Sequence, residues 1–307
     1  MSKETTYSII IPVYNSEKIV SETVKKTIEV LNNINYEIIL INDGSSDNSW
    51  GVISNLASKK NNIIAIDLLK NYGQHTALFC GINHAKGDFL VTMDDDLQNP
   101  PVEIFKLIEK IEEGYDLVFG KFTSKKHKTY RKIGTKIINY LNSKIFNKPD
   151  NITLSNFRIF SKEVADRVKT HNTFYPYIPG LLLMFSNSIG NVETAHHKRE
   201  IGESNYSLWK ILKLTARLLF NYSSYPLKTL TFTGILISLI SFALGMFFVV
   251  RGYFYEVKVP GWTSLAVLLS FFNGFLILLI GVIGEYLSRI LNQISFQKAY
   301  QIREITD

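Results

Sequence analysis

Three consecutive aspartates are the residues of this sequence best placed to do chemistry. Asp94, Asp95 and Asp96 follow the apolar run 88–93, which predicts a strand buried in a parallel sheet. In open α/β sheets, ligands bind beyond the carboxyl ends of the strands. In extended chain Asp94 and Asp96 project to one side, where their charges repel each other unless a cation is present. Their oxygens suit Mg²⁺ or Mn²⁺, although a solvated acidic turn is an alternative interpretation.

The elements that would position these aspartates are predicted from alternating apolar and amphipathic stretches. The expected strands are residues 7–13, 37–41, 63–68, 88–93 and 117–120, and the expected helices include residues 16–31 and 100–113. This alternation predicts an α/β domain with a mostly parallel, twisted sheet. The second strand ends in Asn42-Asp43-Gly44-Ser45-Ser46-Asp47, which combines turn residues with a helix start.

Two long uncharged stretches follow this domain. Residues 229–250 and 259–284 contain no charged side chain. Each stretch exceeds the roughly 20 apolar residues that a helix needs to cross a bilayer. We interpret them as a two-helix transmembrane hairpin with a short linker, because core helices of a soluble domain, the alternative, need a polar face.

Basic residues next to these stretches predict the orientation of the hairpin. They outnumber the basic residues of the linker, so the domain and both termini are expected on the cytoplasmic side. The net charge is +7 and the pI about 9.2, which we assign to contact with a membrane rather than with nucleic acid. Residues 206–222 carry Lys210, Lys213 and Arg217 on one face and predict an interfacial helix; an amphipathic helix packed on the domain is the alternative. The single cysteine, Cys80, fits a reducing compartment, and no signal peptide is visible.

Six segments, in this order, resemble the family 2 glycosyltransferases of GT-A fold. Within that family they resemble the polyisoprenyl-phosphate glycosyltransferases: dolichyl-phosphate mannose synthases and bacterial undecaprenyl-phosphate glucosyl and aminoarabinose transferases. The segments are residues 11–15, 42–47, 71–75, 93–101, 156–158 and 197–207, with the sequences IPVYN, NDGSSD, NYGQH, MDDDLQNPP, NFR and HKREIGESNYS. The resemblance covers residues 7–228, and the two-helix tail agrees with the bacterial members.

The resemblance implies a site for a nucleotide-sugar donor, with a UDP-sugar favoured over a GDP-sugar. Tyr14 is expected to stack on the base and Asp43 to accept from the base or ribose. Arg199 is expected to close over the diphosphate as a planar bidentate donor. The implied donor-binding set is Pro12, Tyr14, Asn15, Asp43, Gly73, Asp94, Asp95 and Arg199.

The resemblance also implies a metal site and an acceptor site. Asp96 and Gln98 are expected to hold Mg²⁺ or Mn²⁺, and Asp94, Asp96 and Arg199 form the expected catalytic set. Arg131, Arg158 and Asn156 are expected at the acceptor phosphate; some relatives carry an aspartate at the position of Asn156. His196 and His197, adjacent in an expected strand, lack metal-ligand spacing and are interpreted as structural or rim residues.

The resulting hypothesis is a metal-dependent, inverting transferase that moves a hexose-type sugar to undecaprenyl phosphate at the cytoplasmic membrane, for the cell envelope. The domains expected are residues 1–205 (GT-A), 206–228 (interfacial helix and linker), 229–287 (transmembrane helices at about 229–250 and 262–284) and 288–307 (cytoplasmic tail). The alternatives are a processive polysaccharide or glycolipid synthase and a non-catalytic membrane scaffold. No tryptophan is preceded by arginine, which argues against the synthase. The oligomeric state is left open, and a homo-oligomer is compatible with the sequence.

Overall fold

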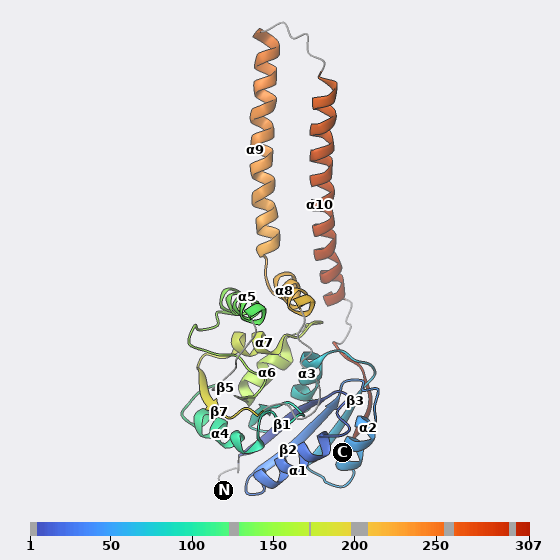
Figure 1. Ribbon diagram of the computed structural model, residues 1–307, viewed down its shortest axis with the longest axis vertical. Helices are drawn as coiled ribbons and strands as arrows, with labels where there is room; N and C mark the ends of the chain where they lie inside the picture. The colour runs from blue at the N-terminus through green and yellow to red at the C-terminus, as the bar shows by residue number, and fades with distance from the viewer. Residues whose placement is uncertain (1–4, 123–128, 172, 198–207, 255–260, 295–298) are drawn as a thin grey trace. The chain divides into compact units, whose positions relative to one another are not determined.

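The chain folds into two compact units (Figure 1). The structure, a computed structural model, describes residues 5–122, 129–171, 173–197, 208–254, 261–294 and 299–307. The sheet unit comprises residues 1–208 and 297–307, and the helical unit comprises residues 209–296.

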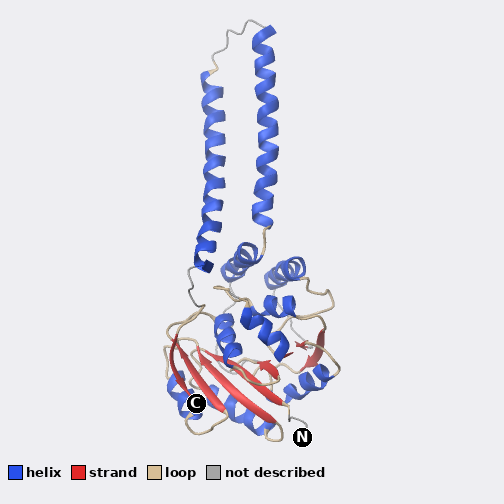
Figure 2. Ribbon diagram, turned by 180° about the vertical axis from the view of Figure 1, so that it is seen from behind, coloured by secondary structure: helices blue, strands red, loops and turns tan. Residues whose placement is uncertain are grey.

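A single sheet runs through the sheet unit, and helices cover both of its faces (Figure 2). Over the described residues the strand order is β7-β5-β6-β4-β1-β2-β3-β8. The strands are β1 Thr6–Val13, β2 Asn35–Asn42, β3 Ile63–Leu68, β4 Phe89–Thr92, β5 Leu117–Phe122, β6 Arg158–Ser161, β7 Ile189–Thr194 and β8 Ile302–Thr306. The mostly parallel sheet expected from the sequence is confirmed, since β1 pairs in parallel with both β2 and β4, and β2 with β3.

Three strands were not expected from the sequence. β6 lies antiparallel between β4 and β5, and β7 lies parallel to β5 on its other side. β8 pairs antiparallel with β3 at the opposite edge. The segment expected as a cytoplasmic tail therefore ends as a strand of the sheet, because β3 would otherwise leave its backbone groups unpaired at the edge.

The side chains of β1 alternate between the two faces and are buried on both, as expected for a central parallel strand. Ile9 and Ile11 belong to a core that includes α1 and α4. On the other face, Ile10 packs so closely on α3 that a Cβ added to Gly81 would lie 2.4 Å from its side chain. The helices of this unit are α1 Val20–Leu31, α2 Ser49–Ala57, α3 Gln74–His84, α4 Ile104–Glu112, α5 Thr129–Phe146, α6 Lys162–Thr170 and α7 Ile178–Phe185.

Two expected helices begin later than the sequence suggested. The helix expected from residue 16 starts at Val20, because the N–H groups of Ile19 and Val20 both donate to the carbonyl of Ser16 in a preceding turn. The helix expected from residue 100 opens with a 3₁₀ turn, Pro101–Glu103, before α4 begins. Proline fits there because its missing N–H would have no partner in the first turn.

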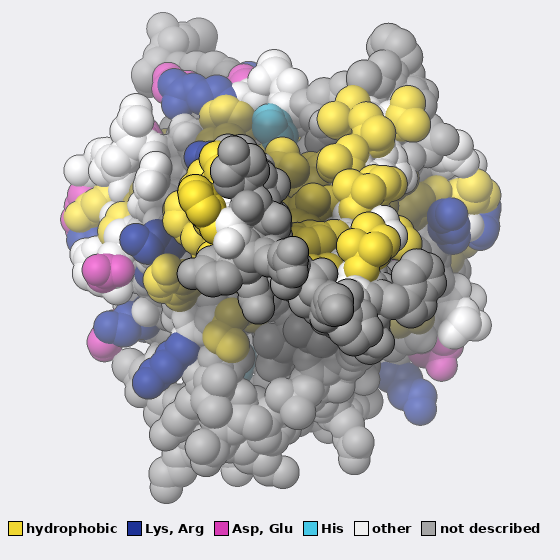
Figure 3. All heavy atoms as spheres, turned by 90° about the horizontal axis from the view of Figure 1, so that it is seen from above, with side chains coloured by type: hydrophobic (Ala, Val, Ile, Leu, Met, Phe, Trp, Pro, Cys, Tyr) yellow, Lys and Arg dark blue, Asp and Glu magenta, His cyan; other side chains and the backbone are white. Residues whose placement is uncertain are grey.

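The helical unit consists of α8 Leu208–Tyr222, α9 Tyr225–Phe254 and α10 Trp262–Ile294. Of the residues 206–222 that were expected to form a helix, those that the structure describes, Leu208–Tyr222, form α8. Large apolar side chains are exposed along α9 and α10, among them Phe232 and Ile277, which are 71% and 70% exposed. Figure 3 shows hydrophobic side chains, in yellow, on the surface of the molecule. Judged on the described residues, no helix is both long and apolar enough to cross a membrane.

Candidate active site

The carboxyl ends of β1 and β4 separate at the point where the strand order reverses. The pairing of β1 with β4 ends at Ile10 and Thr92, whereas β1 stays paired with β2 as far as Val13 and Asn42. In open α/β sheets such a switch point forms a crevice in which ligands bind. The loops that follow β1, β2 and β4 carry the residues singled out in the sequence.

Pro12 lies where β1 and β4 part. The N–H of Met93 donates to the carbonyl of Ile10, so the next outward N–H position of β1 on that side is Pro12. The pairing of β1 with β4 has already ended at this position. Proline has no N–H, and no hydrogen bond of the sheet is lost because of it. Tyr14, which directly follows β1, is 51% exposed. Its ring is therefore accessible to a base.

Asn15 ties the loop after β1 to the loop after β2. Its φ of 52° is left-handed, a conformation that asparagine adopts more readily than most residues. Its N–H donates to Ser45 Oγ at 2.9 Å, and its Oδ1 accepts from the N–H of Ser46 at 2.8 Å. Asn15 thus acts within the site by holding two loops together.

Asp94 lies directly after β4 and has a raised proton affinity. Removal from water and the nearby charge of Asp96 raise the pKa of Asp94 to about 6. Its Oδ1 accepts from Gln74 Nε2 at 2.6 Å, and Asn156 Nδ2 lies 3.5 Å from the same oxygen. A carboxylate held this way by two neutral amides keeps most of its charge uncompensated, which favours a cation.

The other two aspartates of the loop are anchored to the protein. Burial raises the pKa of Asp95 to about 6, although its carboxylate accepts from the Ser16 hydroxyl and the Tyr14 N–H. The carbonyl of Asp95 also accepts from Thr23 Oγ1 at 2.7 Å. Asp95 therefore fixes the β4 loop against the loop after β1. Asp96 is buried, and its Oδ1 accepts from the N–H of Gln98 at 3.1 Å.

Asp43, at the end of β2, holds the loop that leads into α3. Its two carboxylate oxygens accept from the N–H groups of Tyr72 and Gly73 at 2.7 and 2.9 Å. Burial nevertheless raises its pKa to about 6. Asp47, at the end of the same segment, has a local turn role, because its Oδ1 accepts from the N–H of Ser49 at 3.0 Å. Gly73 has φ 95°, and a Cβ there would meet no described atom within 4 Å, so a ligand could approach its backbone.

Arg158, expected at the acceptor phosphate, is buried in the sheet unit. It begins β6, its side chain is fully buried, and Nε donates to Thr92 Oγ1 at 3.0 Å. Among the described atoms, neither terminal guanidinium nitrogen has a hydrogen-bond partner. Burial lowers its pKa to about 10, while the charge of Asp94 acts in the opposite direction. Arg158 therefore lies beneath the acidic loop as a buried positive charge.

The end of β7 passes beside the acidic loop. The N–H of His197 donates to the carbonyl of Gln98 at 2.8 Å. The ring of His196 packs on Phe122 at 4.3 Å between centroids and approaches Asn99 Oδ1 at 3.3 Å. Both histidines follow β7 instead of lying in a strand, so the expected strand placement is wrong; His197 lies at the rim. Arg199 and the side chain of Arg131, which is in α5, lie outside the described residues.

The donor atoms of this site fit a hard divalent cation. Asp94, Asp96 and Gln98 offer only oxygen ligands, and the first two repel each other. In the described part of the chain, no group of three or more His, Cys, Asp or Glu side chains forms a metal cage. Oxygen ligands supplied by a diphosphate would complete the coordination of Mg²⁺ or Mn²⁺. Gln74 was missed as a site residue; its place directly after Gly73 in the NYGQH segment was the available signal.

Known proteins resemble this chain along most of its length. Residues 8–169 match the model of glycosyl transferase family 2. The chain is 33% identical to the uncharacterized glycosyltransferase YkcC of Bacillus subtilis (strain 168), over 99% of this chain and 95% of that protein. It is 33% identical to the undecaprenyl-phosphate 4-deoxy-4-formamido-L-arabinose transferase of Proteus mirabilis (strain HI4320), over 97% of this chain and 93% of that protein.

A solved structure with a similar fold is glucosyl-3-phosphoglycerate synthase from Mycobacterium tuberculosis in complex with Mn²⁺, UDP and phosphoglyceric acid. Its TM-score is 0.53 at 18% identity, over 70% of this chain and 76% of that chain. At this identity the likeness concerns the fold alone.

Proposed function

Because the chain belongs to glycosyl transferase family 2, we propose that it transfers a sugar from a nucleoside diphosphate to a polyprenyl phosphate. It is a glycosyltransferase, and its sheet unit has the GT-A fold. The observation that carries the choice of acceptor is the similarity, over nearly the whole chain, to a transferase named for undecaprenyl phosphate. The crevice at the switch point, with its acidic loop, is the site that would perform the transfer.

The donor nucleotide would bind on the β1 and β2 side of the crevice. The exposed ring of Tyr14 is the platform for the base, at the rim of the site. Asp43 keeps lone pairs free beyond its two backbone bonds and would accept from the base or the ribose. A UDP-sugar is our first choice of donor and a GDP-sugar the comparison.

Asp96 and Gln98 would hold Mg²⁺ or Mn²⁺, with Asp94 beside them. When bound, the cation would neutralise the leaving diphosphate as a Lewis acid. Asp94 must be ionised to do its part, and Gln74 supports this state by donating to its carboxylate. The N–H of His197 donates to the carbonyl of Gln98, and Arg199 is two residues further along the chain. Arg199 would therefore add a bidentate contact to the diphosphate.

The acceptor supplies its own nucleophile. A phosphate monoester carries about −1.5 to −2 charge near neutrality, so no strong general base is required. Its oxygen would form a bond to the anomeric carbon as the bond to the diphosphate breaks. One in-line displacement inverts the anomeric centre, so an α-linked donor gives a β-linked lipid phosphate sugar.

Arg131 is the residue we assign to the acceptor phosphate. Asn156 would orient Asp94 at the border between donor and acceptor. The burial of Arg158 suits an indirect role, in which its positive charge stabilises the ionised form of Asp94. Arg158 would contact a phosphate directly only if the acidic loop moved.

We further propose that α9 and α10 form a membrane hairpin at the cytoplasmic membrane, with the sheet unit and both termini cytoplasmic. The helices are 30 and 33 residues long, and the uncharged stretches 229–250 and 259–284 lie mainly within them. A bilayer needs about 20 residues of helix. The exposed apolar side chains of both helices would then contact lipid. α8 would lie in the headgroup layer through Lys210, Lys213 and Arg217.

A transfer assay tests the proposal. Full-length protein in membranes is incubated with undecaprenyl phosphate and a panel of labelled donors. The panel contains a 4-deoxy-4-formamido-L-arabinose donor, UDP-hexoses and GDP-mannose. Divalent-dependent formation of a lipid-linked sugar from at least one donor is expected. A folded protein that transfers none of them, or transfers only to water, would contradict the proposed acceptor.

A further inference from the structure

β8 brings a basic residue from the end of the chain to the edge of the sheet near the candidate site. The pairing of β8 with β3 shifts by one residue between Asp67 and Leu68, which makes Arg303 the extra residue of a bulge. A bulge re-aims the side chain that it carries. Arg303 Nη1 donates to Asp67 Oδ2 at 3.0 Å, and Nη2 donates to the carbonyl of Leu69 at 2.8 Å.

Through Asp67, Arg303 reaches the loop that follows β2. The side chain of Asp67 is 1% exposed, and its other oxygen accepts from Asn42 Nδ2 at 2.6 Å. Asn42 is buried, precedes Asp43 directly and accepts from the N–H of Ser45 at 3.4 Å. A buried carboxylate needs a compensating cation, and here Arg303 supplies it.

Through Leu69, Arg303 reaches the loop that follows β3. The N–H of Leu69 donates to the carbonyl of Gln301 at 2.9 Å, so Gln301, which precedes β8, and Arg303 together bind both backbone groups of Leu69. The chain then runs through residues 70–73, whose N–H groups at 72 and 73 bind Asp43, and continues to Gln74, which binds Asp94. The end of β3 thus sets the position of a loop that contacts both acidic loops of the site.

We propose that Arg303 is a positioning residue for donor binding: it fixes the end of β3 and, through residues 70–74, the carboxylates of Asp43 and Asp94. This inference rests on the proposed function for its kinetic consequence. Arg303 touches no group assigned to the substrate, so its effect is transmitted by the loop. The C-terminal strand is then part of the donor site's construction, although it follows the helical unit in sequence.

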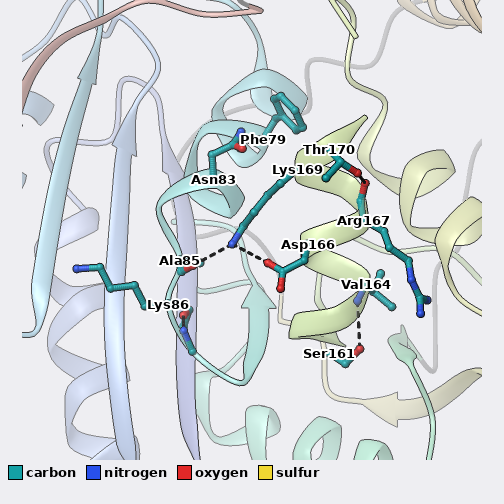
Figure 4. Close-up of polar contacts among 12 residues, drawn as sticks. Phe79, Asn83, Ala85, Lys86, Ser161, Val164, Asp166, Arg167, Lys169 and Thr170 are labelled. Atoms are coloured by element: carbon teal, nitrogen blue, oxygen red, sulfur yellow. Dashed lines mark hydrogen bonds and ion pairs between the residues drawn. The ribbon is translucent and has the colours of Figure 1, made fainter. Parts of the chain in front are cut away.

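The test compares Arg303→Ala with a matched variant, Arg167→Ala. Arg167 in α6 (labelled in Figure 4) also has a half-exposed side chain. It forms an ion pair with Glu163 at 3.9 Å and donates a hydrogen bond to the carbonyl of Phe185 at 3.0 Å. Its partners belong to α6 and to the end of α7, not to the loops after β1, β2, β3 or β4. Full-length variants are assayed for donor KM, acceptor KM and kcat, and hydrogen exchange is followed at residues 70–74.

Arg303→Ala removes both hydrogen bonds of the guanidinium. It is expected to raise donor KM about three- to tenfold, with acceptor KM unchanged, because the loop transmits only part of the lost free energy to the donor site. Exchange at residues 70–74 should accelerate, while Arg167→Ala leaves both measurements at wild-type values. Arg303→Lys restores charge without the fork and should give an intermediate donor KM. Wild-type donor KM and exchange in a folded Arg303→Ala protein would overturn the proposal.

Two further outcomes separate this inference from its premise. If Arg303→Ala does not fold, Arg303→Lys must still show faster exchange at residues 70–74, and wild-type exchange there would overturn the inference. If the wild-type protein transfers no sugar and binds no UDP, the proposed function fails. The exchange experiment then still decides whether Arg303 controls the loop.

Discussion

Carboxylates gather at both ends of the central sheet, but they are used differently. At the carboxyl ends of the strands, the pKa values of Asp43, Asp94 and Asp95 are all raised to about 6, mainly by burial. The pKa values of Asp94 and Asp95 are raised further by the charges of neighbouring aspartates. Negative charge is therefore costly at this end of the sheet, and a bound cation would lower that cost.

At the amino ends of the strands, a cavity is also lined by acidic residues, including Asp88, Asp116 and Asp166. Each has a structural partner. Asp88 accepts from the N–H of Thr6 at 3.0 Å, and Asp166 pairs at 3.2 Å with Lys169, which also donates to the carbonyl of Ala85 (Figure 4). The difference teaches that the number of acids does not identify a site; what matters is whether the fold has already provided their partners.

The largest expected effect is that of Asp96→Asn, which removes an anion from the carboxyl end. We expect transfer to fall by about 100-fold or more, equivalent to roughly 2.7 kcal/mol of transition-state stabilisation. Asp166→Asn, at the amino end, should stay within about threefold, since Asp166 is exposed and ion pairs of exposed groups contribute little. Rates are measured at saturating Mg²⁺ or Mn²⁺. If Asp96→Asn kept near-wild-type activity under these conditions, the carboxylates at the carboxyl ends of the strands would be no more important for transfer than those at the amino ends.

Asp94→Asn tests whether the carboxyl end stores unfavourable charge. The folded pKa of about 6 lies above the ordinary 3.8, so the native state binds more protons than the unfolded state between these values. Stability of the wild type therefore falls as pH rises from 4 to 6 and remains lower above that. Without added metal, Asp94→Asn should be more stable than wild type by about 2–3 kcal/mol at pH 8 and nearly equal at pH 4.

The measurement for Asp94→Asn is urea unfolding across this pH range. Asparagine keeps the oxygen that accepts from Gln74, so the substitution mainly removes charge. If Asp94→Asn were less stable than the wild type at pH 8, Arg158 would already compensate the negative charge of Asp94. The aspartates of the acidic loop would then have their partners within the fold, like those at the amino ends of the strands.

The sequence predicted the core of the sheet and the position of its acidic loop. Apolar runs such as 7–13 are sufficient, because a central parallel strand is buried on both faces and a ligand site follows its carboxyl end. The family segments then assigned Asp43, Asp94 and Asp96 to one site, and the structure places them after β2 and β4, the two strands that flank β1 in the sheet.

The partners of these residues could not be predicted, because they depend on which strands become neighbours. The burial of Arg158 follows from the antiparallel insertion of β6 between β4 and β5, which no local pattern specifies. The contact of Arg303 with Asp67 joins positions 236 residues apart in sequence. Periodicity describes one element at a time and contains no information on such pairing.

Gln74→Leu tests how the fold keeps Asp94 charged. Its amide lowers the pKa of Asp94 by donating to the carboxylate, although burial has the larger and opposite effect. Loss of this bond should raise the pKa of Asp94 further, so the acidic limb of kcat/KM moves to higher pH. We expect kcat/KM of Gln74→Leu to be about tenfold below that of the wild type near pH 6.5, and the difference to become smaller above pH 8.

The control for Gln74→Leu is Asn55→Ala, an exposed amide on α2, which should leave the pH profile unchanged. A uniform decrease at all pH values would show that Gln74 acts on the substrate directly instead of through Asp94.

The smallest expected effect is that of Asp116→Ala, which removes a carboxylate from the amino end. Asp116 Oδ2 accepts from the N–H groups of Asn187 and Ser188 at 2.8 and 3.0 Å, where β7 begins. Asn187 is exposed, so water can replace the lost acceptor, and we expect a loss of only about 1 kcal/mol of stability. The change in stability has the opposite sign to that expected for Asp94→Asn at pH 8. The carboxylate of Asp116 stabilises the fold, whereas the buried charge of Asp94 destabilises it. Urea unfolding measures the loss, and kcat/KM below the transition should equal that of the wild type. Reduced transfer by the folded Asp116→Ala protein would show that the amino end contributes to function after all.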